Sequence, residues 1–183
     1  MSRAKVILVD ADVISHFIAT AHIYDLNDIL SPHHLLVVEN VYREATYHPW
    51  DATRKVKVDK WLKNSKTEKI QFPYTNNNIK EEFFRLKRDN KLLGDGECAC
   101  MSMAKFGKEV IASSNFRDVA TYCDANDIEY IGVMDILQIA QNKGFWTVDQ
   151  CNAFIQDAKT INLARFPVSR IEDYQSRIDL NSF

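Results

Sequence analysis

The sequence predicts an α/β domain of three layers, in which helices cover both faces of a central, mainly parallel sheet. Short apolar runs rich in β-branched residues alternate with longer segments whose apolar residues recur at helical spacing. The chain has 183 residues and is 46% hydrophobic and 26% charged, which is typical of one globular domain. Residues 1–160 should form this domain, with a lysine-rich helical insertion around residues 50–90. Residues 161–183 should form a tail that binds a partner or is partly disordered.

The expected strands are short apolar runs: Lys5–Val9, Leu35–Val38, Ile70–Phe72, Val110–Ala112 and Tyr130–Val133. The expected helices have apolar residues every three or four positions: 13–30, the segment from Val41, 50–64, 79–90, 97–104, 119–123, 134–142 and 147–159. Thr147 and Gln150 have the spacing of a capping box, which marks the start of the last of these helices.

Charge and cysteine content narrow the possible classes of protein. The net charge of −2 gives no overall basic field, although a local basic patch beside an acidic site would be hidden in that sum. No apolar stretch approaches the roughly 18 residues of a membrane span, and the first residues do not resemble a signal peptide, so we expect a cytoplasmic protein without membrane contact. The four cysteines follow no disulfide pattern and should be reduced structural thiols.

Acidic residues follow the expected strands or begin the helices after them. Asp10 and Asp12 come directly after the first strand, and Glu44 lies in the helix after the second. Asp95 lies between two glycines, and Glu97 follows the second glycine at the entrance of a helix of small residues. After Val110–Ala112 come three further polar side chains: Ser113, Asn115 and Asp118. Ligands of open α/β sheets bind at the carboxyl ends of the strands, so these side chains are candidates for one site.

Carboxylates without histidine or cysteine partners favour a hard cation. Oxygen ligands of this kind suit Mg²⁺ or Mn²⁺, which can activate water for in-line attack on a phosphodiester and stabilise the leaving oxygen. Each acid has an alternative interpretation, because a carboxylate in a first helical turn also caps the helix and many others are surface charges. Spacing alone leaves both interpretations open.

Four motifs in this order resemble the PIN domain family, the small ribonuclease domains of toxin–antitoxin toxins and related RNases, including an uncharacterised subfamily. The segment Val6–Ile14 resembles the opening strand and its acid, and Val41–Glu44 resembles the second acidic position. The segment Gly96–Ala99 resembles the third, and Ser113–Asp118 resembles the fourth. The resemblance covers roughly residues 5–158, and it implies a PIN-like fold and a metal-dependent ribonuclease.

The resemblance implies a role for each candidate residue. Asp10, Glu44, Glu97 and Asp118 would bind the metal, and Asn115 and Ser113 would orient ligands or water. Asp12 and Asp95 are second-tier candidates, as outer groups around the metal or as helix caps. Two departures bear on activity, because Asn115 stands where many members have aspartate and Ser113 replaces the usual threonine. An amide binds Mg²⁺ more weakly than a carboxylate does, so the site would be slower or partly degenerate.

A basic segment is the candidate contact for RNA. Four of its side chains would meet the phosphate backbone: Arg54, Lys55, Lys57 and Lys60. Trp61 or Tyr74 would stack on a base, or would instead pack in the core. A lysine-rich helix is also a common solvated surface.

Three functional hypotheses remain. The first is a Mg²⁺- or Mn²⁺-dependent endoribonuclease, the toxin of a toxin–antitoxin or defence system held in check by an antitoxin or inhibitor protein. The second is a catalytically weak PIN-fold module that binds RNA or protein. The third is a metal phosphohydrolase for a small ester, which the missing glycine-rich phosphate loop disfavours. The resemblance also implies a possible homodimer.

Overall fold

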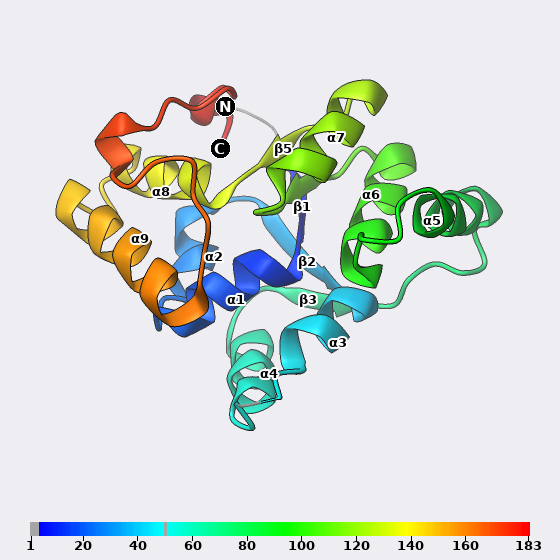
Figure 1. Cartoon of the computed structure of the whole chain (residues 1–183), viewed down its shortest axis with the longest axis horizontal. Coiled ribbons are helices and arrows are strands. Elements are labelled where there is room, and N and C mark those ends of the chain that lie inside the picture. The colour runs from blue at the N-terminus through cyan, green and yellow to red at the C-terminus, as the bar shows by residue number, and fades with distance from the viewer. Residues whose placement is uncertain (1–3, 50) are drawn as a thin grey trace.

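The computed structural model describes residues 4–49 and 51–183 and confirms the predicted three-layer α/β/α sandwich. Five described strands form one all-parallel sheet in the order β3-β2-β1-β4-β5. Their bounds are Val6–Val9 for β1, His34–Val38 for β2, Glu68–Ile70 for β3, Val110–Ala112 for β4 and Tyr130–Ile131 for β5. In Figure 1, α2, α8 and α9 lie on one side of the strands, and α5, α6 and α7 lie on the other.

The helices have the following bounds: α1 Ala11–Ala19, α2 Asp25–Ile29, α3 Glu39–Thr46, α4 Arg54–Asn64, α5 Asn77–Asp89, α6 Asp95–Gly107, α7 Thr121–Asn126, α8 Val133–Asn142 and α9 Val148–Asn162. A π-helical turn covers Phe116–Ala120, and short 3-10 turns cover Ile171–Asp173 and Leu180–Ser182. The expected capping box opens α9, because Thr147 Oγ1 accepts from Gln150 N and the Gln150 side chain accepts from Thr147 N. None of the described helices is long and apolar enough to cross a membrane.

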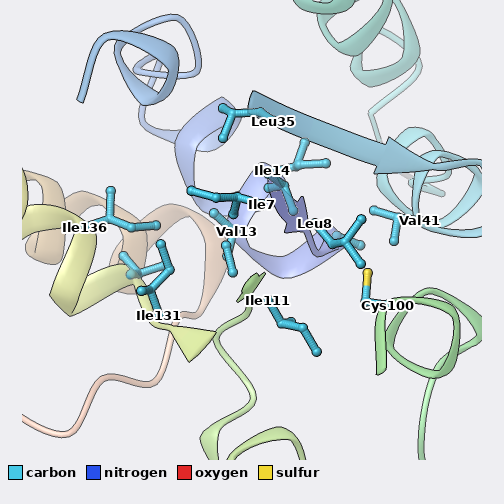
Figure 2. Close-up of a cluster of buried hydrophobic side chains, with 14 of the residues drawn as sticks. Ile7, Leu8, Val13, Ile14, Leu35, Val41, Cys100, Ile111, Ile131 and Ile136 are labelled. Carbon is cyan, nitrogen blue, oxygen red and sulfur yellow. The ribbon is translucent and has the colours of Figure 1, made fainter. Parts of the chain in front are cut away.

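Strand β1 is the middle of the sheet and the centre of the core. Ile7 pairs in register with Leu35 of β2 and with Val110 of β4, and all three side chains are buried. Because helices cover both faces of the sheet, such a strand is a continuous run of apolar residues in the sequence. Figure 2 shows Val41 of α3 and Cys100 of α6 near Leu8. Helix α6 packs on β1, and α3 packs on the neighbouring strands β2 and β3.

Several element boundaries differ from the prediction: α6 is longer than the expected 97–104, and the expected helix 119–123 is a π-helical turn followed by α7. The helical segment 13–30 is two helices, because the chain turns over Thr20–Tyr24 with Ala21 at φ 63. Strand β3 covers Glu68–Ile70 and not the predicted Ile70–Phe72. The Phe72 ring is instead buried, with its centroid 5.0 Å from that of Phe83. Val133 starts α8 and does not extend β5.

The basic segment is folded against the domain. Trp50, its first residue, lies outside the described residues. Trp61 of α4 is completely buried, and its Nε1 donates to Asn27 Oδ1 at 2.8 Å. Of the two alternatives for Trp61, packing in the core is confirmed and stacking on a base is excluded. Tyr74 is half exposed, with its ring centroid 4.7 Å from that of Phe72.

The C-terminal tail packs along α8 and α9. Ile171 and Phe183 are buried. Tyr174 Oη and Ser176 Oγ donate to Asp135 Oδ1 of α8 at 2.9 and 2.6 Å. These contacts make the tail a continuation of the core, and binding of a partner by it stays a prediction.

Candidate functional site

The sheet changes winding direction between β1 and β4. From β1 the chain adds β2 and β3 on one side, and then returns to add β4 and β5 on the other. Asp10 follows β1 directly, and Ser113 follows β4. Because ligands of open parallel sheets bind at such a switch point, beyond the carboxyl ends of the strands, this edge is the candidate site.

Asp10 is the buried acid at this edge, with 2% of its surface exposed. Its Oδ1 accepts from Ala11 N at 2.7 Å, and its Oδ2 accepts from Ser113 Oγ at 2.9 Å. Burial first, and then the charges of Glu97 and Asp12, raise the pKa of Asp10 to about 8, although both hydrogen bonds oppose the rise. Near neutral pH, Asp10 is therefore an acid whose ionised form needs a nearby positive charge.

Glu97 is connected to Asp10 through two intervening residues. Its Oε2 accepts from Gly94 N at 2.9 Å at the start of α6, and its Oε1 accepts from Asn115 Nδ2 at 2.6 Å. Asn115 N in turn donates to Ser113 Oγ at 3.1 Å. One chain of hydrogen bonds thus runs from Asp10 through Ser113 and Asn115 to Glu97.

Glu44 reaches the same helix start from α3. Its Oε1 accepts from Gly96 N at 3.0 Å. A Cβ atom added at Gly96 would stand 2.6 Å from Glu44 Oε2, and one at Gly94 would stand 2.9 Å from Oε1, so both glycines are needed for this approach. Burial first, and also the charges of Asp95 and Glu97, raise the pKa of Glu44. Asp10, Glu44 and Glu97 also add to the effect of burial in raising the pKa of the Cys100 thiol beneath them.

A hollow of about 540 Å³ opens at this edge of the sheet, and we call it the acidic hollow. Glu44 lines it, whereas Asp10 and Glu97 are not among its lining residues. Asp12, Glu44 and Asn115 line it together with Arg54 and Arg165. Asp12 is exposed at its mouth, but the surrounding protein raises its pKa and the Arg54 guanidinium opposes that rise. Acidic and basic groups therefore share one opening, as a site for a phosphate and its counter-ion requires.

Two predicted acids lie away from this group. Asp118 Oδ1 accepts a long hydrogen bond from Asn90 Nδ2 at 3.5 Å, and the Asp118 amide donates to Asn115 Oδ1. Asp118 is therefore held at the start of the π-helical turn. Asp95 is exposed and pairs with Lys87 Nζ at 2.8 Å. Its backbone N–H lowers the pKa of Glu44 and the charge of its side chain raises it.

Of the four predicted RNA contacts, one lies at the acidic hollow and three lie away from it. Arg54 is buried beside the acidic hollow, where its Nε donates to Ala45 O at 2.7 Å and its guanidinium also contacts Ser15 Oγ. Lys55 pairs with Asp59 at 2.5 Å and Lys57 with Asp51 at 3.4 Å. Lys60 is exposed on the same helix. Of the four, only Arg54 lines the acidic hollow.

Several residues that line the acidic hollow could not be identified from the sequence. His16 is buried, and burial first, then the charge of Arg54, lower its pKa to about 4, so it is a neutral ring at pH 7. Its Nδ1 is 2.8 Å from Asn162 Nδ2 at the end of α9. Ser114 and Arg165 also line the hollow. Arg165 reaches it from the tail, a contact that only the tertiary fold creates.

The donor chemistry of the site fits a hard divalent cation, but three ligands are not preassembled. Within residues 4–49 and 51–183, no three His, Cys, Asp or Glu side chains form a group that could hold a metal ion. Magnesium is commonly held by one or two carboxylates, several waters and the oxygens of a substrate phosphate. Asp10 and Glu97, whose charges repel each other, are the pair that fits this pattern.

Comparisons of the chain with family models, curated proteins and solved structures find no match. The resemblance to PIN domains therefore stays a prediction that depends on the four motifs.

Proposed function

We propose that the chain is a metal-dependent endoribonuclease that hydrolyses RNA phosphodiester bonds with Mg²⁺ or Mn²⁺. The observation that carries this proposal is the meeting of Asp10, Glu97 and Glu44, from three separate segments, at the switch point of the parallel sheet. Asp10 is buried, and Glu44 and Glu97 are half-buried. Acids held close together away from water destabilise a protein unless they are protonated or neutralised, and a bound cation would explain their grouping.

Asp10 and Glu97 would hold the cation, with Glu44 and Asp12 adding negative charge nearby. When bound, it would lower the pKa of a water molecule and stabilise the leaving oxygen. Ser113 fixes the direction of the Asp10 carboxylate, and the Asn115 amide does the same for Glu97. Groups in this supporting position matter because their loss typically lowers metal affinity or activity roughly 10–100-fold.

Arg54 and Arg165 would receive the phosphates on the other side of the acidic hollow. A guanidinium can donate two parallel hydrogen bonds to a phosphate, which fixes its orientation as well as its position. Arg54 is already held by Ala45 O and Ser15, so binding would cost it little side-chain entropy. Arg165 is exposed and would order when the substrate binds.

Cleavage of a labelled single-stranded RNA in Mg²⁺ or Mn²⁺ tests the proposal. Asp10→Asn and Glu97→Gln should reduce the rate at least ~10–100-fold, and calorimetry should show cation binding that Asp10→Asn weakens. Asp118→Asn is the matched control, because this acid is at the same edge of the sheet but bonded to Asn90. Cleavage that survives Asp10→Asn and Glu97→Gln would refute the proposed site.

The alternative is a catalytically weak module on the same fold that binds RNA or protein. It is favoured by the hydrogen bonds that both oxygens of Asp10 and both oxygens of Glu97 already accept from the chain. RNA binding without cleavage in either metal would identify this alternative. Control by an antitoxin or inhibitor protein, and a homodimer, remain further expectations of the resemblance.

A further inference from the structure

A second hollow, of about 570 Å³, lies between the tail and the β5–α8 side of the domain, and we call it the tail hollow. Ser114 and Arg165 line both it and the acidic hollow. The two hollows are therefore neighbours with a common wall. The volume is within the roughly 300–1,000 Å³ of pockets that bind small molecules.

Aromatic rings form much of the tail hollow. Tyr130 of β5 lines one part, and Phe166 and Tyr174 of the tail line another. The Tyr174 ring is fixed, because its hydroxyl donates to the buried Asp135. Rings held in place in this way can stack on a nucleobase with little loss of side-chain entropy.

Two arginines supply positive charge to this hollow. Arg165 and Arg177 are both exposed, and within the described residues neither guanidinium forms an ion pair. Burial raises the pKa of Tyr130 and Tyr174, and the charge of Arg177 opposes both rises, so this guanidinium lies close to both rings. Arg170, in the same tail, differs because it pairs with Glu172 at 2.5 Å and does not line the hollow.

The two acids that line the tail hollow, Asp135 and Asp173, do not neutralise the charges of its arginines. Asp135 accepts hydrogen bonds from Gly132 N, Tyr174 Oη and Ser176 Oγ, so its charge is already balanced by three donors. Asp173 is exposed to solvent on its 3-10 turn, where water screens its charge. At the common wall, Ser114 Oγ is buried and has no hydrogen-bond partner in the described part of the chain.

We propose that the tail hollow binds a nucleotide of single-stranded RNA that neighbours the nucleotide entering the acidic hollow. The base stacks among Tyr130, Phe166 and Tyr174, and Arg177 and Arg165 contact the phosphates on either side of it. Aromatic faces combined with guanidinium groups are the usual means of binding single-stranded RNA. This inference rests on the proposed function, since it extends the path of the same substrate.

Fluorescence anisotropy with a labelled oligouridylate in EDTA tests the inference without catalysis. Arg177→Gln should weaken binding about fivefold near 0.1 M salt and reduce the slope of log affinity against log salt by about 0.7, because one phosphate contact is lost. Tyr130→Leu should weaken binding roughly fivefold or more through lost stacking, with the slope unchanged. Arg170→Gln is the matched control and should change neither quantity.

The outcomes separate this inference from the proposed function. Binding that depends on Arg177 and Tyr130, in a protein that never cleaves RNA, would support the nucleotide site and refute the hydrolase. Cleavage that depends on Asp10, with RNA affinity and salt slope equal in wild type, Arg177→Gln and Tyr130→Leu, would refute the nucleotide site alone. If Arg177→Gln and Tyr130→Leu abolish binding of a protein partner but leave RNA binding unchanged, the nucleotide site is also refuted.

Discussion

Replacing Asp10 with asparagine should stabilise the metal-free protein at neutral pH, although it removes the central acid of the site. Burial and the charges of Glu97 and Asp12 move the pKa of Asp10 from 3.8 to about 8. Below pH about 4, both the folded and the unfolded chain hold this proton, and the group costs the folded state nothing. As the pH rises from about 4 to 8, only the unfolded chain releases the proton, so the free energy of unfolding falls.

The size of this loss follows from the shift. A proton that only the folded chain retains lowers the free energy of unfolding by ~1.4 kcal/mol per pH unit, so the loss between pH about 4 and pH 7 is roughly 4 kcal/mol. Asparagine keeps an acceptor for Ala11 N and has no proton to release, but its amide must donate to Ser113 Oγ where the carboxylate accepted, at a cost of about 1 kcal/mol. The net expectation is a stabilisation of about 3 kcal/mol at pH 7, or roughly 6–12 °C in melting temperature.

Urea unfolding of wild type and Asp10→Asn in EDTA, from pH 4 to pH 8, measures this effect. The two stability curves should separate as the pH rises, with wild type losing stability relative to the variant. Asp135→Asn is the matched control: Asp135 is also 2% exposed but accepts from Gly132 N, Tyr174 Oη and Ser176 Oγ, so its replacement should destabilise at every pH. If Asp10→Asn is as destabilising as Asp135→Asn at pH 7, the repulsion inferred for the site does not exist.

Two further substitutions test other features of the structure. Gly96→Ala should destabilise by about 1–3 kcal/mol in urea unfolding and displace Glu44, because the new Cβ would meet Glu44 Oε2 at 2.6 Å and the α3 backbone at 3.2 Å. Gly107→Ala, where only a movable glutamate carboxylate is in the way, should cost much less; equal losses would contradict this reasoning. Hydrogen bonds from Arg85 and other donors lower the pKa of Glu82 to about 2, so ionised Glu82 stabilises the fold above pH ~4.5 and this contribution disappears as the pH falls toward 2. Glu82→Gln lacks this contribution at every pH, so its stability should fall less on acidification than that of wild type. Identical acid unfolding midpoints for Glu82→Gln and wild type would count against this assignment.

The strands could be predicted from the sequence because helices cover the sheet on both faces. Each interior strand is then a continuous apolar run, and the acid that ends the run at Asp10 marks the edge of the sheet. The break over Thr20–Tyr24 could not be predicted, because Ala21 adopts φ 63 without the glycine that usually signals such a turn. Its conformation is imposed by the packing of two helices that their sequence alone does not separate.

The candidate site could be predicted in part for the same physical reason. Asp10 and Glu97 stand where a strand ends and a helix begins, and parallel strands bring such positions to one edge. Asp118 lies further from the end of β4, where the π-helical turn holds it against Asn90, and no residue pattern indicated that turn. Arg165 reaches the acidic hollow only because the tail is packed on α8 and α9, a result of contacts between residues far apart in sequence.

The hydrogen bond from Ser113 Oγ to Asp10 Oδ2 also sets when the site exists during synthesis. It joins residues 103 positions apart, one on each side of the seam between β1 and β4. At about 5–20 residues per second, a ribosome adds Ser113 roughly 5–20 s after Asp10. In the later part of that interval the nascent chain contains Asp10, Glu44 and the α3 segment but lacks β4, so β1 has β2 beside it on one side only. Assembly of the acids therefore waits for the second half of the sheet, and an incomplete chain has no formed site.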